Sequence, residues 1–204
     1  MRATALATLL AVAATASLPA LAQGVPPDPQ RLIGPAVVAE VRDFLETEIV
    51  RLSVESQNER YEGMDLSRIE ALDRQWVAER EASDKPLIAA TLSSPLSVYL
   101  TRVQARALGL YVEIFITDEH GLNVGQSAIT SDYWQGDEAK FQKTFPSGPT
   151  AVFIDEAEWD AGLKIWRAQL NLTIADASGR TPIGSATVEI NLTELMRRSA
   201  VIGG

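Results

Sequence analysis

The hydrophobic pattern of the chain changes its period once, close to Leu110, and this change separates a helical half from a strand half. Before this point, apolar residues recur every three or four positions, which places them on one side of a helix. After it, apolar and polar residues alternate, which is typical of strands with one buried face. Helices followed by a run of strands predict an α+β fold, in one domain over residues 35–202.

The longest predicted helix begins at Pro35 and continues to about residue 57. Its apolar positions step by three and four and are Val38, Val41, Leu45, Ile49 and Leu52. Such a stripe packs against a sheet or forms a seam between two chains. The heptad pattern does not persist, which favours packing against a sheet.

Two further helices are predicted before the strands. Asp65 is a suitable N-cap for the first, with Ser67 and Glu70 as an alternative capping box. Ser94 followed by Pro95 is a suitable start for the second. The sequence SDKP at residues 83–86 ends the first of them, and a short helical turn follows it. Gly109 ends the second.

Five strands and a closing helix are predicted after Leu110. The strands span residues 110–117, 122–129, 150–154, 163–174 and 182–192, and the helix spans residues 193–201. The sequence DASGR at residues 176–180 joins the last two strands in a hairpin. We therefore expect a five-stranded antiparallel sheet with the long N-terminal helix packed on it.

Alternation along the strands assigns their residues to two faces of the sheet. One face is wholly apolar and contains Leu110, Val112, Ile114, Ile116, Ala168, Leu170, Leu172, Ile174, Ala186, Val188, Ile190 and Leu192. The other face is mixed and contains Tyr111, Glu113, Phe115, Arg167, Gln169, Asn171, Thr173, Ser185, Thr187, Glu189 and Asn191. The mixed face is either open to solvent or covered by residues 130–149, with a polar pocket between. The unusual length of that connection favours the covered arrangement, because long ordered loops tend to be functional.

The stretch GLNVGQSAITSDYWQGDEAKF at residues 121–141 holds the most distinctive polar loop of the chain. Asp132, Tyr133 and Trp134 follow one another in it, and aromatic side chains with a nearby charge suit a small-ligand pocket. We interpret them as a lid, with Asp132 placed to pair with a ligand ammonium group. In the alternative, Asp132 caps a helix and Trp134 packs inward. Lys140 follows on a short predicted helix, either facing a carboxylate or in solvent.

Two further groups are candidates for contact with a ligand. Arg167 lies in the middle of a strand, where its guanidinium group either binds a ligand carboxylate or pairs with Glu113 or Glu189 across the strands. An acidic run at residues 155–160 surrounds Trp159 and lacks the spacing of a calcium loop. It is therefore interpreted as a solvated loop, from which Asp155 reaches the pocket.

The composition argues against most catalytic chemistry. The chain has one histidine, His120, and no cysteine, which excludes ordinary His/Cys metal sites and cysteine nucleophiles. No Gly-x-Ser-x-Gly motif is present. We expect no enzyme activity, no metal and no cofactor.

The N-terminal residues predict export. Arg2, an apolar run at residues 3–18 and the Ala20-Leu21-Ala22 pattern are typical of a cleavable signal peptide over residues 1–22. The alternative is an uncleaved anchor, for which the run is short. Residues 23–34 are expected to be a flexible leader. The net charge of -9 argues against nucleic acid as a partner.

In order and spacing, these residues resemble the extracytoplasmic Cache (PDC-type, PAS-like) sensor domains. The most specific parts are EIFITDEHGLNVGQSAITSDYWQGDEAKF, the short strand AVFIDEAEW and the hairpin IADASGRTPIGSATVEINLTEL, within a resemblance that covers residues 35–195. The resemblance implies a ligand on the sheet face opposite the long helix, under the connecting loops. Most such domains lie between two membrane spans of a receptor, whereas this sequence is similar to a free-standing periplasmic member.

We therefore expect a periplasmic small-molecule sensor that signals through a separate membrane receptor or histidine kinase. The ligand is expected to be an amino acid, an organic acid or an amine. The alternative is a ligand-free interaction module, in which the stripe of the N-terminal helix mediates dimerisation. A homodimer through that helix is a candidate assembly for the sensor as well. The expected ligand-binding residues are Tyr111, Glu113, Phe115, Gln126, Asp132, Tyr133, Trp134, Asp155, Arg167 and Gln169.

Overall fold

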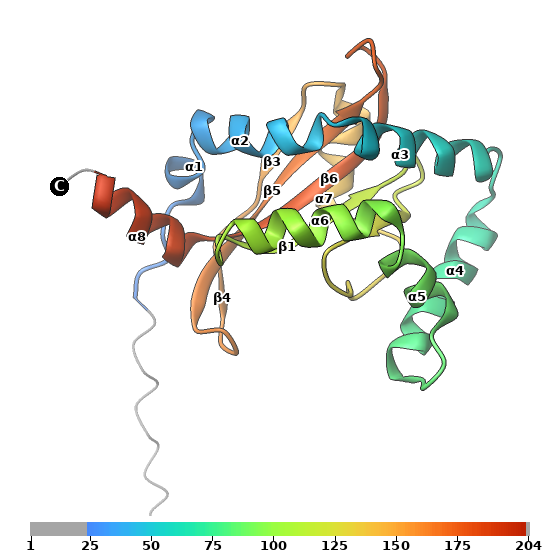
Figure 1. Cartoon of the computed structure of the whole chain (residues 1–204), viewed down its shortest axis with the longest axis horizontal. Helices are drawn as coiled ribbons and strands as arrows, with labels where there is room; N and C mark the ends of the chain where they lie inside the picture. Colours follow the sequence, from blue (N-terminus) through green and yellow to red (C-terminus); the bar gives the residue numbers. More distant parts are fainter. Residues whose placement is uncertain (1–23, 203–204) are drawn as a thin grey trace, which may run out of the picture.

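An antiparallel sheet forms the centre of the protein. The computed structural model describes residues 24–202, in which six strands form one sheet in the order β2-β1-β6-β5-β3, with β4 paired to part of β5 (Figure 1). The strands are β1 Tyr111–Thr117, β2 Asn123–Gln126, β3 Val152–Ile154, β4 Glu158–Asp160, β5 Ile165–Ala175 and β6 Pro182–Asn191. The predicted α+β fold with an antiparallel sheet is confirmed, with one strand more than expected.

The additional strand, β4, lies in the acidic run that was expected to be a solvated loop. Glu158 is in register with Arg167 and Asp160 with Ile165, so the run turns back onto β5. Trp159 packs edge-on against Trp166, with ring centroids 5.4 Å apart. This aromatic pair across the hairpin explains why a segment rich in carboxylates is a strand.

The helices are short relative to the single long helix expected at the start. They are α1 Pro29–Leu32, α2 Pro35–Leu45, α3 Glu48–Arg60, α4 Leu66–Glu81, α5 Pro86–Leu92, α6 Pro95–Arg106, α7 Ala139–Gln142 and α8 Leu192–Ile202, with a 3₁₀ turn at Phe145–Ser147. Helices α2, α3 and α6 pack on the apolar face of the sheet in one core (Figure 1). The N-caps expected from the sequence are present, because Asp65 accepts from the Arg68 N–H and Ser94 from the Ser97 N–H.

The expected long helix is broken at Glu46 and Thr47. Thr47 has an extended backbone, with φ -103° and ψ 152°, and its hydroxyl donates to the Phe44 carbonyl. A threonine side chain that bonds to the backbone of the preceding turn competes with the helical pattern. The break lets α2 and α3 bury their apolar residues separately on the twisted sheet.

The segment before α2 differs from the flexible leader that was expected. Asp28 caps α1 by accepting from the N–H groups of Gln30 and Arg31, and Ile33 is buried in the main core. The Gln30 side chain also donates to the Ile154 carbonyl at 2.9 Å. The predicted signal peptide at residues 1–22 lies outside the described residues.

A bulge in β1 moves Tyr111 to the opposite face from the one expected. Tyr111 is in register with Ile190 and Glu113 with Glu189, so two steps along β1 match one step along β6. The extra residue reverses the alternation. Tyr111 therefore packs on Phe44 of α2 and donates to Glu40 at 3.0 Å. Burial, together with the neighbouring Glu40, raises the pKa of Tyr111.

The mixed face of the sheet is covered, not open to solvent. Its polar residues in the centre are buried, and they are Thr117, Asn171, Thr173, Ser185, Thr187 and Glu189. The segment 127–149, with α7 and the 3₁₀ turn, contacts β5 and β6 on this side. Phe141 and Phe145 of that segment stack at 5.1 Å. The covered arrangement expected from the length of this connection is thus present.

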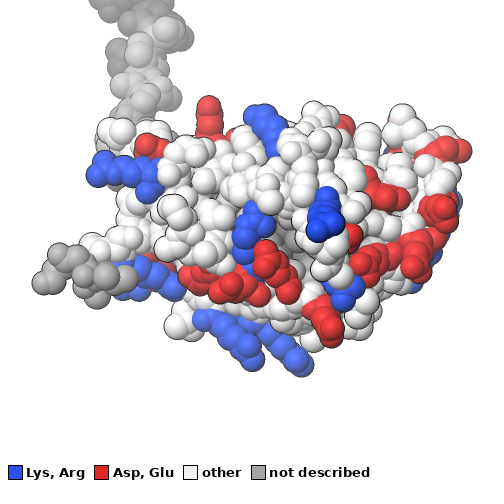
Figure 2. All heavy atoms as spheres, turned by 90° about the horizontal axis from the view of Figure 1, so that it is seen from above, with Lys and Arg blue, Asp and Glu red and all other residues white. Residues whose placement is uncertain are grey.

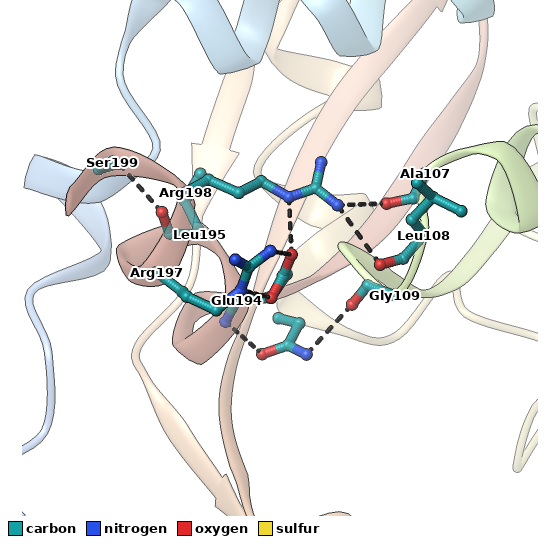
Figure 3. A network of polar contacts seen from close by, with 9 residues as sticks. Ala107, Leu108, Gly109, Glu194, Leu195, Arg197, Arg198 and Ser199 are labelled. Atoms are coloured by element: carbon teal, nitrogen blue, oxygen red, sulfur yellow. Dashed lines mark hydrogen bonds and ion pairs between the residues drawn. The ribbon is translucent and has the colours of Figure 1, made fainter. Parts of the chain in front are cut away.

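The last helix is fastened to the junction between α6 and β1 (Figure 3). Asn191 caps α8 by accepting from the Glu194 N–H and donates its own side-chain amide to the Gly109 carbonyl at 3.1 Å. Arg198 donates to Glu194 at 2.9 Å and to the Ala107 carbonyl at 2.6 Å. Hydrogen bonds from Arg197 and Arg198 lower the pKa of Glu194 to about 2.

Charge is unevenly distributed on the surface. Figure 2 shows acidic side chains gathered toward the end where α3 leads to α4, with both signs mixed elsewhere on this face. Among the helices within residues 24–202, none has the length and hydrophobicity needed to cross a membrane.

Candidate functional site

A cavity of about 180 Å³ opens between the mixed face of the sheet, the start of α7 and the connection from β3 to β4. We call it the Arg167 cavity. Its ionisable lining residues are Glu138, Lys140, Asp155, Glu156, Glu158, Arg167 and Glu189. The cavity combines a concave shape with convergent polar groups, which is the usual form of a small-ligand site.

Arg167 lies at the centre of the charges around this cavity. Its guanidinium group is 2.9 Å from Glu189, 3.3 Å from Glu158 and 3.6 Å from Asp160. The cross-strand pair with Glu189, one of the two alternatives raised from the sequence, is therefore present. The Arg167 Nε atom is buried and has no hydrogen-bond partner within residues 24–202.

A row of three polar residues crosses the sheet beside the cavity. Glu113 of β1, Glu189 of β6 and Gln169 of β5 are in register with one another. Gln169 and Glu189 line the cavity, whereas Glu113 lies one strand further on. Burial raises the pKa of Glu113, and the neighbouring Glu189 raises it further. Burial also raises the pKa of Glu189, against the opposing effect of Arg167.

Lys140 closes the cavity from the α7 side. Its ammonium group is 3.0 Å from Glu138 and 3.1 Å from the Gln135 side-chain oxygen. It also lies 5.3 Å from the centroid of the Phe115 ring, close enough for a cation–π contact. Of the two positions considered for Lys140, the one facing a carboxylate is the one observed.

Gln126 lies deeper under the covering segment. It is fully buried and in register with Phe115, and its side-chain oxygen accepts from Thr130 at 3.4 Å. Its side-chain nitrogen has no hydrogen-bond partner within residues 24–202. Gln126 is thus on the expected face but is not among the residues that line the cavity.

The loop at Asp132, Tyr133 and Trp134 lies away from the cavity. Tyr133 is 2% exposed and stacks on Trp76 of α4, with ring centroids 5.2 Å apart. In place of the expected lid over a ligand pocket, Tyr133 forms part of a second core, because α4 and α5 enclose this loop. Trp134 packs against the same core and donates to the His120 carbonyl.

Asp73 of α4 explains how the loop is held in place. Its carboxylate accepts from the backbone N–H groups of both Tyr133 and Trp134, at 2.9 and 3.0 Å. Asp132 lies beside these contacts, and within residues 24–202 its carboxylate accepts only from the neighbouring Ser131. No signal in the sequence singled out Asp73, since the contact joins residues about 60 positions apart.

The structure thus brings together part of the expected set. Asp155, Arg167 and Gln169 line the cavity, and Glu113 and Phe115 border it. Tyr111 lies on the opposite face, and Asp132, Tyr133 and Trp134 lie at the second core. Glu138 and Glu156 were missed as site residues, because only the folded loop and hairpin bring them to Arg167. Glu189 had been assigned to the mixed face by alternation and considered as a partner of Arg167.

No protein-family model matches the sequence, and no curated protein matches it. Among solved structures, the chain is similar to the ligand-binding domain of the Pseudomonas aeruginosa PAO1 amino acid chemoreceptor PctC in complex with GABA. The identity is 17%, the match covers 78% of this chain and 62% of that chain, and the TM-score is 0.36. It is also similar to the sensory domain of the Campylobacter jejuni chemoreceptor Tlp3, with 14% identity, 78% and 62% coverage and a TM-score of 0.39.

The chain spans less than two thirds of the length of these structures. With TM-scores below 0.5, we take neither a binding site nor a ligand from them. Both are described as sensory or ligand-binding domains and neither as an enzyme.

Proposed function

We propose that this protein is a periplasmic sensor domain that binds a small molecule in the Arg167 cavity. The observation that carries the proposal is the cavity itself, in which Gln169 and Arg167 of one strand meet Lys140 of the covering segment. Its volume of about 180 Å³ suits a ligand of only a few heavy atoms. Binding would tighten the segment 127–149 against the sheet and so shift the population of a closed state. A membrane receptor or histidine kinase would read that state.

The proposal predicts that a small ligand stabilises the protein through Gln169. A thermal-shift screen of the purified protein against amino acids, organic acids and amines should give at least one clear rise in melting temperature. At a ligand concentration 100 times the dissociation constant, mass action contributes about 2.7 kcal/mol. Gln169→Ala should abolish the rise and leave the melting temperature without ligand nearly unchanged, because the Gln169 side chain makes no hydrogen bond to another residue within the described range 24–202. Gln142→Ala, an exposed glutamine outside the cavity, is the matched control. A rise that survives Gln169→Ala would place the ligand elsewhere.

One observation favours a second candidate function, a dimerisation module. A groove of about 560 Å³ runs between α3 and α6, and Leu52 is 52% exposed in it. Glu48 and Arg60 line its two ends. Two copies with antiparallel α3 helices would place each Glu48 beside the partner's Arg60, and each Leu52 beside the small side chain of the partner's Ser56. Opposite charges at the ends and a large residue facing a small one suit a two-fold interface.

This second candidate predicts a dimer that depends on Leu52. Light scattering should give a dimer mass for the natural protein and a monomer mass for Leu52→Glu, because the new carboxylates would be buried at the interface. Leu66→Glu is the matched control, since Leu66 is similarly exposed on α4, outside the groove. A monomer mass for the natural protein at high concentration would exclude this function.

A further inference from the structure

The two cationic side chains at the Arg167 cavity are already paired. Arg167 is shared by Glu189, Glu158 and Asp160, and Lys140 is 3.0 Å from Glu138. The Arg167 Nε, which has no hydrogen-bond partner within residues 24–202, is buried and so is not offered to the cavity. Both cationic side chains therefore form ion pairs with carboxylates of the protein itself.

Two carboxylates at the cavity lack such a partner. The Asp155 side chain accepts only from the adjacent Glu156 N–H, at 2.9 Å, among the contacts of residues 24–202. Within the same residues, neither Asp155 nor Glu156 has a Lys or Arg group within ion-pair distance. Both side chains line the same cavity as Arg167 and Gln169. Negative charge is therefore in excess at its mouth.

The free-energy cost of binding at this site differs between a negatively and a positively charged ligand group. A ligand carboxylate that binds Arg167 competes for its guanidinium group with Glu189, whose side chain is only 8% exposed, and in the limit displaces it. Glu189 would then be a buried charge without a partner, next to Glu113, and this is strongly unfavourable. A ligand ammonium group meets Asp155 and Glu156 without breaking any ion pair. Charge-assisted hydrogen bonds to these carboxylates are among the stronger polar contacts in proteins.

We propose that the Arg167 cavity selects a small organic cation, a short amine that carries no carboxylate. Asp155 and Glu156 bind the ammonium group, and Gln169 accepts from it or from a second polar group of the ligand. Arg167 is a positioning residue, which holds Glu189 and Glu158 in place instead of binding the ligand. This inference rests on the proposed function and narrows its ligand to one of the three classes expected from the sequence.

Four probes with the same number of carbon atoms differ only in their charged groups. Titration calorimetry with the purified protein measures the affinity of each. They are propylamine, 1,3-diaminopropane, 3-aminopropanoate and propanoate. The two amines should bind at least tenfold more tightly than 3-aminopropanoate, and propanoate should not bind. Tighter binding of propanoate or 3-aminopropanoate than of propylamine would overturn the inference and leave the proposed function standing. Binding of none of the four, in a protein that also gives no thermal shift with any class of ligand, would overturn both.

Substitutions at the cavity test where the amine binds. Asp155→Asn should weaken amine binding at least tenfold, and Glu156→Gln should weaken it less, because Glu156 is exposed to water. Asp137→Asn removes an exposed carboxylate outside the cavity and should have no effect. Equal amine binding by all three variants would show nonspecific attraction to an acidic surface and would overturn the proposal.

Discussion

Replacing Tyr133 with alanine should lower the free energy of unfolding by about 3–5 kcal/mol, the cost of removing a large aromatic side chain from a core. The ring is buried against Trp76, Leu122 and the residues of α4 and α5. Its loss leaves a cavity that the Trp76 ring cannot fill without losing the hydrogen bond from its Nε1 to the Thr130 carbonyl. Chemical denaturation followed by tryptophan fluorescence measures the change.

The matched variant is Tyr133→Phe, which keeps the ring and should lose only a small part of the stability. If Tyr133→Ala unfolds at the same denaturant concentration as the natural protein but no longer binds ligand, the residue is a lid after all and its stacking on Trp76 contributes little.

Replacing Gly184 with alanine should lower the free energy of unfolding by about 3 kcal/mol, at the upper end of the usual cost of overpacking. A β-carbon at Gly184 would lie 2.1 Å from the Thr117 carbonyl oxygen and 3.1 Å from a methyl group of Val54. The oxygen belongs to the backbone of β1, so the strands β1 and β6 must separate to make room. Thermal unfolding measured by circular dichroism reports the loss.

Gly34→Ala is the control for this substitution. A β-carbon there meets no atom of the described residues within 4 Å, and the φ of -78° suits any residue. The melting temperature of Gly34→Ala should therefore stay close to that of the natural protein. An equal and small effect at both positions would mean that the centre of the sheet relaxes easily, contrary to the close contact of β1 and β6.

The local signals of the sequence were sufficient for most elements of the fold. The capping residues Asp65 and Ser94 fixed the starts of α4 and α6, and the change of period at Leu110 fixed the start of the sheet. These features depend on neighbours within a few residues. The break at Thr47 and the bulge beside Tyr111 were missed, because each depends on how the segment fits the rest of the sheet.

In the candidate site, too, local patterns were sufficient for some residues, whereas others depend on distant parts of the chain. Alternation along β5 placed Arg167 and Gln169 on one face, and the order of the strands then brought Asp155 beside them. The aromatic loop was misplaced because its environment is made by α4, about 60 residues earlier in the chain. A pair of aromatic residues in a polar loop has the same pattern whether it covers a ligand or joins a core.

The position of β6 in the sheet has a consequence for how the protein is made. β6 contains residues 182–191 and lies between β1 and β5, so it pairs with a strand that was synthesised some 70 residues before it. Until β6 has left the ribosome, β1 and β2 cannot be joined to β5 and β3 by the hydrogen bonds of the sheet. Such long-range pairing is slow and comes late. In a nascent chain of this design, the sheet is therefore completed only after β6 has been synthesised.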